Sequence, residues 1–324
     1  MPELIIHILN FRTPKLTVEC LQSLAAERDT YSDFEVILID NASGDDSVPK
    51  LTEAIDAAGW KSWVRFLPLE KNLGFAGGNN HSLNLNLAEA SPAPFQLLLN
   101  SDTVVHAGCL AASVAWMKAH PDAGAFSCML RNADGSVQNV CRKFPRPDRE
   151  TARALGLPYI LPKAFGWADL EDPGWDREQA VSRPVEWVGG AFMLLRTEAV
   201  QQAGVMNPDF FFYGEDCEWC FRLRKHGWRI YFDACASITH FGGGSSDTTR
   251  LLDKRREILT WRARFEVQRC CYGRLAAWWI RGVYIYAFAT RTLWLALSGQ
   301  RKTLKYASIR SGLRTLTHPL RLES

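Results

Sequence analysis

The sequence has few of the features that mark a membrane-spanning, secreted or disulfide-stabilised protein. No stretch from residue 253 onward reaches the roughly 18 uninterrupted apolar residues that a transmembrane helix needs. The N-terminus lacks the basic start and small-residue cleavage site of a secretory signal, so we expect the chain to be cytoplasmic. Its nine cysteines are an odd number, scattered over 324 residues, which favours reduced thiols. Cys217 and Cys220 form a CxxC pair without a second pair at zinc spacing, and we interpret both as buried helix residues.

Composition excludes a disordered or fibrous protein, because 47% of the residues are hydrophobic and 23% are charged. The net charge of +3 conceals an asymmetry. Residues 253–324 carry a net charge of +11, and the preceding part of the chain carries −8. We therefore divide the chain into an acidic body, residues 1–250, and a basic, aromatic-rich helical region, residues 251–324.

Short apolar runs alternate with helical patterns at the rhythm of βαβ units, which predicts an α/β fold with a Rossmann-like, mainly parallel sheet flanked by helices. The expected strands are 4–11, 34–39, 64–67, 95–99, 123–127, 185–195, 228–232 and 236–239. The expected helices lie near 15–27, 47–58, 76–87, 107–120, 197–203 and 215–226. Residues 132–135 indicate a hairpin, and 145–184 is an irregular stretch typical of a functional loop or lid.

Motifs at the carboxyl ends of the strands matter most, because ligands of open α/β sheets bind there. Asp40 follows the second expected strand and could accept a hydrogen bond from a nucleobase or a ribose hydroxyl. Alternatively, Asp40 and Asn41 only shape the turn and cap the next helix. Residues 72–80, NLGFAGGNN, form a glycine-rich loop that opens a helix, where the backbone can approach an anionic ligand. The glycine spacing is not that of a dinucleotide-binding loop, and a plain structural turn explains it equally well.

An apolar strand ends in Asn100, Ser101 and Asp102. Oxygen-bearing side chains at such a position suit a hard divalent cation, which in turn neutralises a diphosphate, and we predict Asp102 as the carboxylate ligand. Alternatively, Asp102 is the N-cap of the helix expected from residue 107. Residues 103–106 lie between them and weaken this interpretation. His240 follows a late strand, before a glycine-rich loop. A lone histidine is more often a packed or surface residue, so its role depends on whether Asp102 is near in space.

Glu215 and Asp216 lie in the first turn of an expected helix, after an aromatic run. The helix dipole favours carboxylates there whatever their function, and Glu218 with Arg222 has the spacing of an ordinary helix salt bridge. The aromatic residues that precede this helix would partly desolvate one carboxylate and raise its pKa into the range of a general base.

Together and in this order, the motifs resemble the family 2 glycosyltransferases of the GT-A fold, and are most similar to the bacterial rhamnosyltransferase-like members. The similarity covers roughly residues 4–246. It rests on the set DNAS, NLGFAGGNN, LLNSD, GGAFMLLR and YGED followed by the late histidine.

The resemblance implies roles for individual residues. Asp216 matches a general base that takes the proton of the acceptor hydroxyl, so that direct displacement inverts the anomeric centre and one carboxylate suffices, unlike in hydrolases. Asp102 and His240 match ligands of Mg²⁺ or Mn²⁺, and residues 100–102 occupy the place of the DxD motif with only the last position acidic. The residues implied in binding the nucleotide sugar are Asn10, Asp40, Asn72, Gly74, Asn79, Asn100, Ser101 and Gly190.

The basic region contains a candidate interfacial helix over residues 275–297. Its apolar residues share one face and its arginines lie on another side, which is typical of a helix lying on anionic lipid. The apolar residues are Trp279, Val283, Tyr286, Leu293 and Leu297, and the arginines are Arg274, Arg281 and Arg291. Packing on the catalytic domain or on a second subunit explains the pattern nearly as well, and a homo-oligomer stays open. Nucleic-acid binding ranks last, because no known motif for it is present.

We therefore hypothesise an inverting, metal-dependent glycosyltransferase at the inner face of the cell membrane, acting in cell-surface polysaccharide synthesis. The donor is a nucleotide diphosphate sugar, with dTDP-rhamnose suggested by the resemblance alone, and the acceptor is a saccharide or a polyprenol-linked molecule. The rival hypothesis is a catalytically silent carbohydrate-binding or scaffold protein on the same fold, against which Asp102, Asp216 and His240 argue. A nucleotidyltransferase would need a glycine-containing phosphate loop that residues 10–14 lack.

Overall fold

The chain folds into two compact units. The computed structural model describes residues 2–170, 183–242 and 250–317. The first unit comprises Met1–Arg142, Glu171–Phe211 and Glu215–Asp247, and the second comprises Lys143–Leu170, Phe212–Gly214 and Thr248–Ser324. The sequence analysis divided the chain between residues 250 and 251, whereas the second unit also takes in residues 143–170.

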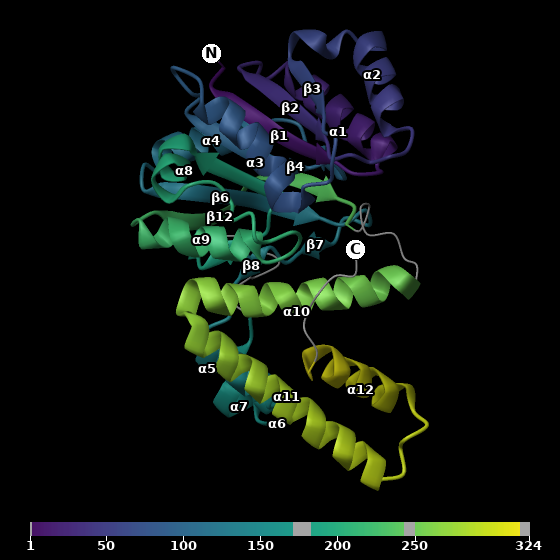
Figure 1. Ribbon diagram of the computed structural model, residues 1–324. Coiled ribbons are helices and arrows are strands. Elements are labelled where there is room, and N and C mark those ends of the chain that lie inside the picture. The colour runs from purple at the N-terminus through teal and green to yellow at the C-terminus, as the bar shows by residue number, and fades with distance from the viewer. Residues whose placement is uncertain (1, 171–182, 243–249, 318–324) are drawn as a thin grey trace. The chain divides into compact units, whose positions relative to one another are not determined.

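The first unit is built on a twisted sheet to which ten strands of the described residues contribute (Figure 1). Its order is β3-β2-β1-β4-β11-β6-β12-β5, with β7 beside β6 and β9 beside β12. The strands are β1 (Leu4–Asn10), β2 (Phe34–Asp40), β3 (Val64–Pro68), β4 (Phe95–Asn100), β5 (Thr103–Val105), β6 (Ala123–Arg131), β7 (Val137–Gln138), β9 (Arg183–Val185), β11 (Phe192–Arg196) and β12 (Arg229–His240). Strands β1 to β4 pair in parallel, as do β6 and β12, while β11 is antiparallel to both its neighbours. The predicted mainly parallel sheet is confirmed.

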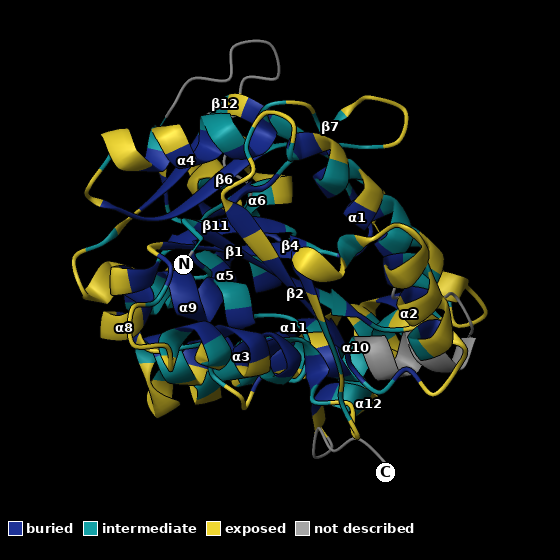
Figure 2. Ribbon diagram, turned by 90° about the horizontal axis from the view of Figure 1, so that it is seen from above, coloured by how far each residue is buried: buried dark blue, intermediate teal, exposed yellow. Residues whose placement is uncertain are grey.

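Helices cover both faces of this sheet (Figure 2). Helices α1, α2 and α4 lie on one face, and α3, α8 and α9 lie on the other, as right-handed crossovers between parallel strands require. Their bounds are α1 (Pro14–Glu27), α2 (Ser47–Ala57), α3 (Gly74–Leu87), α4 (Cys109–Ala119), α8 (Thr197–Ala203) and α9 (Glu215–Lys225), with a 3-10 turn η1 (Trp60–Ser62) after α2. Because both faces are covered, the central strands are apolar almost throughout.

Two buried carboxylates of the first unit, those of Glu27 and Glu218, have defined hydrogen-bond partners. The carboxylate of Glu27 accepts hydrogen bonds from the backbone N–H groups of Gly108 and Leu110, at 2.6 and 2.9 Å, and so caps the start of α4. Arg222 donates to Glu218 at 2.9 Å, which confirms the predicted helix salt bridge. Cys217 and Cys220 are buried free thiols, as predicted.

Three local predictions about strands differ from the structure. The expected strand 185–195 is divided, because Gly189 and Gly190 separate β10 (Trp187–Val188), which pairs with β8 (Cys141–Arg142), from β11. The expected strands 228–232 and 236–239 are one strand, β12, whose register against β6 shifts between Phe232 and Ser237. Strand β5 was not predicted. The hairpin at residues 132–135 is confirmed by the β6–β7 pairing.

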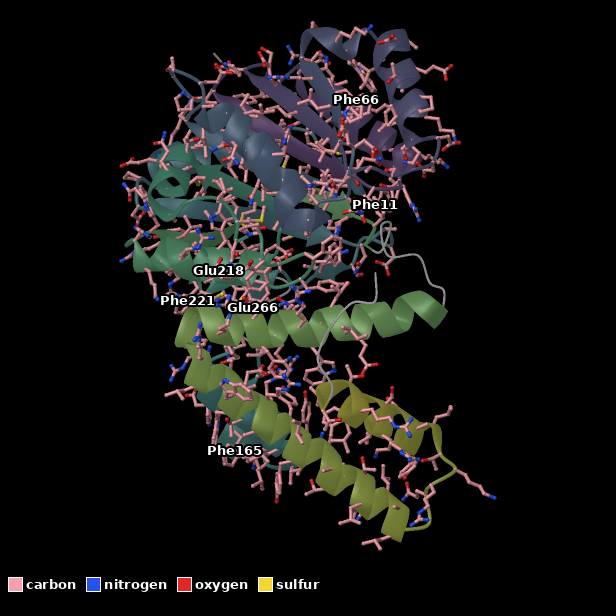
Figure 3. The ribbon with its side chains drawn as sticks, viewed as in Figure 1. Phe11, Phe66, Phe165, Glu218, Phe221 and Glu266 are labelled. Atoms are coloured by element: carbon pink, nitrogen blue, oxygen red, sulfur yellow. The ribbon has the colours of Figure 1, made fainter. Side chains whose placement is uncertain are left out.

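The second unit is helical. It contains α5 (Pro147–Ala154), α6 (Leu157–Ile160), α7 (Pro162–Phe165), η2 (Gly166–Ala168), α10 (Arg250–Tyr272), α11 (Arg274–Leu297) and α12 (Leu304–Thr317); Figure 3 labels Phe165 on α7. Ala154, Phe265, Ile280, Tyr284 and Leu316 form its core.

The irregular stretch 145–184 is thus partly helical. Its residues 171–182 lie outside the described part of the chain, as does most of the glycine-rich loop after His240. The predicted helix over 275–297 is confirmed as α11. Within the described residues, no helix has both the length and the apolar character needed to cross a bilayer.

Candidate active site

Three polar side chains end neighbouring parallel strands at one edge of the sheet. The register places Asn10 of β1 beside Asp40 of β2, and Asn100 of β4 beside Leu9 of β1. The residues before them are apolar and buried between the helix layers, so the polar residues begin where the strands leave the core. The carboxyl edge is therefore polar at the places that the sequence predicted.

Asn10 and Asp40 form a closed hydrogen-bond cluster. Asn10 Nδ2 donates to Asp40 Oδ1 at 2.6 Å, and Asn10 Oδ1 accepts from the Thr17 hydroxyl at 2.8 Å. Asp40 Oδ1 also accepts from the Ser43 hydroxyl at 2.6 Å, and Oδ2 accepts from the Ser43 N–H at 3.0 Å. The two interpretations of Asp40 are therefore compatible. Asp40 shapes the turn, and its carboxylate has further lone pairs that could accept hydrogen bonds from a nucleotide.

The glycine-rich loop is held by side-chain amides. Asn41 Nδ2 donates to Asn72 Oδ1 at 3.1 Å and to the Gly74 carbonyl at 3.0 Å, and Asn72 Oδ1 also accepts from the Gly74 N–H at 2.8 Å. Gly74 has φ +72°, and a Cβ atom there would lie 2.3 Å from the Phe211 carbonyl oxygen. Glycine is required at this position, because it has no Cβ to clash. The loop is therefore held rigidly at the start of α3.

Asn79, another predicted donor-binding residue, is buried one turn into α3. Its Nδ2 donates to the Phe75 carbonyl at 2.9 Å, and the Phe75 N–H donates to the Phe211 carbonyl at 2.8 Å. Asn79 is 3% exposed, so in this conformation it supports the loop from within.

Asp102 and His240 are brought together, which answers the question that the sequence left open. Asp102 Oδ1 lies 3.4 Å from His240 Nε2, and both residues are largely buried. The pairing arises because β12 runs antiparallel to β5, with His240 opposite Thr103. Asn100 Nδ2 lies 3.3 Å from the same His240 nitrogen. The Ser101 hydroxyl lies 3.2 Å from that of Thr13, so Ser101 belongs to the same edge.

Gln138 fixes the orientation of the His240 ring. Its Nε2 donates to the His240 carbonyl and to Asn132 Oδ1, both at 2.6 Å, so its Oε1 faces His240 Nδ1, at 2.9 Å. The proton between them is on Nδ1, since an amide oxygen can only accept. His240 Nε2 therefore either carries a second proton or presents a lone pair toward Asp102.

This pair fits a divalent cation. A carboxylate oxygen and an imidazole lone pair that face each other across 3.4 Å repel unless a proton or a cation lies between them. A carboxylate oxygen suits Mg²⁺ and Mn²⁺, an imidazole nitrogen is a common ligand of divalent transition metals, and the partner on Nδ1 is the usual support of a ligating histidine. Within the part of the chain that the structure describes, no group of three His, Cys, Asp or Glu residues could hold a metal. A cation here would thus take its remaining ligands from a bound molecule and water.

Asp216 is the second residue of α9 and lies near the two glycines that follow β10. Its Oδ1 accepts from the Cys217 N–H at 2.8 Å, and a Cβ atom on Gly189 would lie 3.8 Å from its Oδ2. Burial raises the pKa of Asp216 to about 6, against the opposing effects of the Cys217 and Gly190 N–H groups and of Arg142. Asp216 is therefore ionised at pH 7 and basic enough to take a proton.

The adjacent Glu215 behaves differently. Burial and the neighbouring Asp216 charge raise the pKa of Glu215 well above its usual range. Its Oε2 is buried, and no other described residue hydrogen-bonds to it. Burial and the charge of Asp216 therefore both disfavour ionisation of Glu215.

One backbone segment connects the Asp102–His240 pair to Asp216. The Asn100 N–H donates to the Ala191 carbonyl at 3.0 Å, and Gly190, which precedes it, contributes an N–H to Asp216. The predicted residues at the ends of β1, β2 and β4 and at the start of α9 are therefore parts of one connected region. Sequence analysis missed two participants, Gln138 and Arg142. The only available signal for Gln138 was its place in the predicted hairpin.

Known proteins resemble this chain in sequence and in fold. A family model described as glycosyltransferase-like family 2 matches residues 2–260. The chain is 28% identical over 224 residues to the N-acetylglucosaminyl-diphospho-decaprenol L-rhamnosyltransferase of Mycobacterium tuberculosis, covering 67% of this chain and 68% of that protein. It is 23% identical over 211 residues to the low-salt glycan biosynthesis hexosyltransferase of Haloferax volcanii, covering 65% and 62%.

Two solved structures share the fold. One is a mannosyltransferase from Pyrobaculum calidifontis in complex with GDP-mannose and Mn²⁺, with a TM-score of 0.55 and 14% identity, covering 98% of this chain and 85% of that one. The other is GalNAc-T7 with UDP, GalNAc and Mn²⁺, with a TM-score of 0.56 and 13% identity, covering 83% and 50%. The predicted GT-A fold is confirmed.

Proposed function

The chain belongs to the glycosyltransferase-like family 2, and from this membership we propose that it is an inverting, metal-dependent transferase of a nucleotide-diphosphate sugar. The observation that carries the proposal is the Asp102–His240 pair, 3.4 Å apart, linked through Asn100 and Ala191 to the base Asp216. A cation-binding pair and an ionised carboxylate at one sheet edge are what this reaction needs.

The residues divide between donor and acceptor. Asn10, Asp40, Asn72, Gly74 and Asn79 would line the nucleotide side. Residues 100, 101 and 190 would lie near the diphosphate and the sugar. In support, Asp40 keeps acceptor capacity for a base or ribose, and the N-terminus of α3 favours the negative charge of the donor.

In the proposed reaction, the acceptor hydroxyl oxygen attacks the anomeric carbon on the face opposite the diphosphate. Its proton passes to Asp216, and the bond from the anomeric carbon to the diphosphate oxygen breaks with its electron pair on the phosphate. Asp216 acts at neutral pH because its raised pKa makes it a stronger base than an exposed aspartate. A single carboxylate suffices, and the anomeric configuration inverts.

Asp102 and His240 would hold Mg²⁺ or Mn²⁺ together with oxygens of the donor. The bound cation would supply positive charge to the leaving diphosphate. The Gln138 amide holds the His240 ring in place for this purpose. Mn²⁺ in two solved structures of the same fold is consistent with this assignment.

The names of the relatives suggest substrates. The mycobacterial relative and a 24% identical Escherichia coli relative, which aligns over 173 residues covering 52% of this chain and 61% of that one, are both named rhamnosyltransferases. The mycobacterial name also specifies a decaprenol-linked acceptor. We therefore favour dTDP-rhamnose as donor and a polyprenol-linked saccharide as acceptor, used at the inner face of the cell membrane in polysaccharide synthesis.

Thermal stability in the presence of UDP-, dTDP- and GDP-sugars, each with and without Mn²⁺, tests the proposal. A ligand at 100 times its dissociation constant stabilises the fold by about 2.7 kcal/mol, enough to shift the melting temperature measurably. We expect one nucleotide class to stabilise the protein only with Mn²⁺, and His240→Ala to weaken that Mn²⁺-dependent stabilisation. If no nucleotide sugar stabilises the protein, the silent carbohydrate-binding or scaffold alternative replaces this proposal.

A further inference from the structure

Helix α11 has a buried inner face within the helical unit. Ile280, Tyr284, Ala287 and Leu295 are buried on it. Ile280 and Tyr284 pack with Leu316 of α12 in the core of the unit. Val283, which the sequence placed on the outer apolar face, is instead partly buried and packs against the same core.

The outer face of the same helix is also hydrophobic, yet it is exposed. Its large side chains recur at spacings of three, four or seven residues, which places them on one face. Each is more than half exposed: Leu275, Trp278, Trp279, Tyr286, Leu293 and Leu297. An apolar stripe along a helix of 24 residues, about 36 Å long, is unusual for a surface that faces only water.

Two of the three arginines of α11, Arg281 and Arg291, hydrogen-bond to backbone carbonyls of the helical unit. Arg281 donates to the Leu316 carbonyl at 2.8 and 3.1 Å, and Arg291 donates to the Ala154 carbonyl at 3.1 Å. These carbonyls belong to the last turns of α12 and α5, where a guanidinium group satisfies unpaired acceptors and the negative end of the helix dipole. Both guanidinium groups therefore help to hold the helical unit together.

The surrounding surface is strongly basic. Residues 267–322 contain ten Lys and Arg residues and no Asp or Glu. Exposed cations lie at both ends of α11 and along α12: Arg274, Arg301, Lys302, Lys305, Arg310 and Arg314. Residues 267–322, which include α11 and α12, thus combine an exposed apolar stripe with flanking positive charge and contain no Asp or Glu.

These features together favour an anionic lipid surface over a protein partner. Trp and Tyr, which make up half of the stripe, combine an apolar body with a polar tip and concentrate at membrane–water interfaces. A second copy of this chain would bring its own basic residues against those of the first and would be repelled. A bilayer that contains anionic lipid satisfies both the apolar stripe and the cations.

We propose that the outer face of α11 is a docking surface for an anionic lipid bilayer, in which the stripe enters the interfacial layer and the flanking cations contact lipid phosphates. The proposal deepens the proposed function, because it rests on an acceptor held in a membrane. The side chains that would contact the bilayer belong to the helical unit and not to the first unit.

Co-sedimentation of the full chain with vesicles tests this surface. Neutral phosphatidylcholine vesicles are compared with vesicles that contain about a third phosphatidylglycerol. The apolar variant is the triple substitution Trp278→Gln, Leu293→Gln and Leu297→Gln, which leaves Trp279 intact because its indole donates to Thr151. We expect wild-type protein to bind anionic vesicles roughly tenfold more tightly than neutral ones, and the triple variant to lose that binding by about tenfold or more.

Two double charge variants distinguish an effect of the cations beside α11 from an effect of the net charge of the chain. The double substitution Arg301→Glu and Lys302→Glu should weaken anionic vesicle binding by roughly tenfold. Lys61→Glu with Arg65→Glu makes the same change in net charge on the exposed surface of the first unit and should alter binding less than twofold. Equal losses from the two pairs would refute a docking surface on α11.

Other outcomes also decide the matter. Wild-type protein that binds neither vesicle, or a triple variant that binds as wild type, overturns the proposal. A concentration-dependent dimer in analytical ultracentrifugation that the triple variant abolishes would assign the stripe to a second copy. Stabilisation by a nucleotide sugar with Mn²⁺, measured without lipid, reports the proposed function separately. A chain that binds the sugar and ignores vesicles therefore loses only the docking surface.

Discussion

Substituting Gly74 by alanine should destabilise the protein more than its backbone angle alone explains. At φ +72° an alanine costs about 1 to 2 kcal/mol relative to glycine. Its Cβ would also lie 2.3 Å from the Phe211 carbonyl oxygen and 2.8 Å from the Phe211 ring. Since that carbonyl accepts from the Phe75 N–H, moving it would also weaken a hydrogen bond worth about 1 kcal/mol.

Gly59→Ala is the matched control. Gly59 has φ +69°, and a Cβ atom there would meet nothing within 4 Å. The control therefore measures the cost of the backbone angle without the collision. We expect Gly74→Ala to lower the free energy of unfolding by about 2 kcal/mol more than Gly59→Ala, from the lost hydrogen bond and the crowding.

Urea denaturation of the two variants and the wild type measures this difference, provided that the slope of each transition is unchanged. Activity per folded molecule should fall for Gly74→Ala, because the loop at residues 72–80 and the segment at Phe211 move apart, and should stay at the wild-type level for Gly59→Ala. Equal destabilisation by the two substitutions would show that Gly74 is needed only for its backbone angle, and the argument for a rigid loop would fail.

Three further predictions concern the proposed chemistry. The pH profile of kcat/KM should fall as pH drops through about 6, because protonation of Asp216 removes the base, and Asp216→Asn should abolish transfer while leaving donor binding nearly intact. His240→Ala should raise the Mn²⁺ concentration needed for half-maximal activity. Gln138→Met should weaken Mn²⁺ binding, measured by calorimetry with donor present, by about 10 to 100-fold, whereas Gln138→Glu, which keeps an acceptor for the imidazole, should lose less.

Each of these has an outcome that would contradict it. Lost donor affinity with unchanged turnover in Asp216→Asn would move Asp216 to the donor side. A metal titration of His240→Ala that matches the wild type would remove His240 from the site. Equal effects of Gln138→Met and Gln138→Glu would mean that Gln138 acts on the hairpin fold and not on the imidazole.

The stability of the protein should also depend on Asp216. Its pKa in the folded state, about 6, is above that of an unfolded aspartate, so the folded state binds the proton more tightly. This residue's contribution to stability is therefore greatest below the unfolded pKa and is lost as pH rises toward 6. Asp216→Asn should flatten the dependence of the unfolding free energy on pH in this range, and an unchanged slope would contradict the raised pKa.

Much of the first unit could be predicted from local sequence. The strands that end in Asn10, Asp40 and Asn100 are apolar runs that stop abruptly at polar residues, and parallel pairing then places those residues at one edge. The glycine-rich loop was also recognisable, because its backbone conformation depends on residues within it. Strand 185–195 was predicted too long, since two consecutive glycines in an apolar run do not reveal that the chain leaves the sheet there.

The helical unit shows which structural features the hydrophobic periodicity of the sequence cannot predict. The pattern of α11 correctly predicted a helix with two different faces. It did not reveal that Arg281 and Arg291 hydrogen-bond to backbone carbonyls, because these carbonyls lie 35 and 137 residues away in the sequence. Nor did it reveal that residues 143–170 join the C-terminal helices.

The sequence by itself determined the strand ends, the helix starts and the kinds of side chain at the candidate site, because these depend on apolar runs and turns of a few residues. Only the tertiary structure decided that His240 lies 3.4 Å from Asp102 and that Gln138, 102 residues before the histidine, orients its ring. These contacts depend on the order and direction in which β5, β12 and β6 pair. Strand pairing over such distances reflects the packing of the whole sheet, which no local pattern encodes.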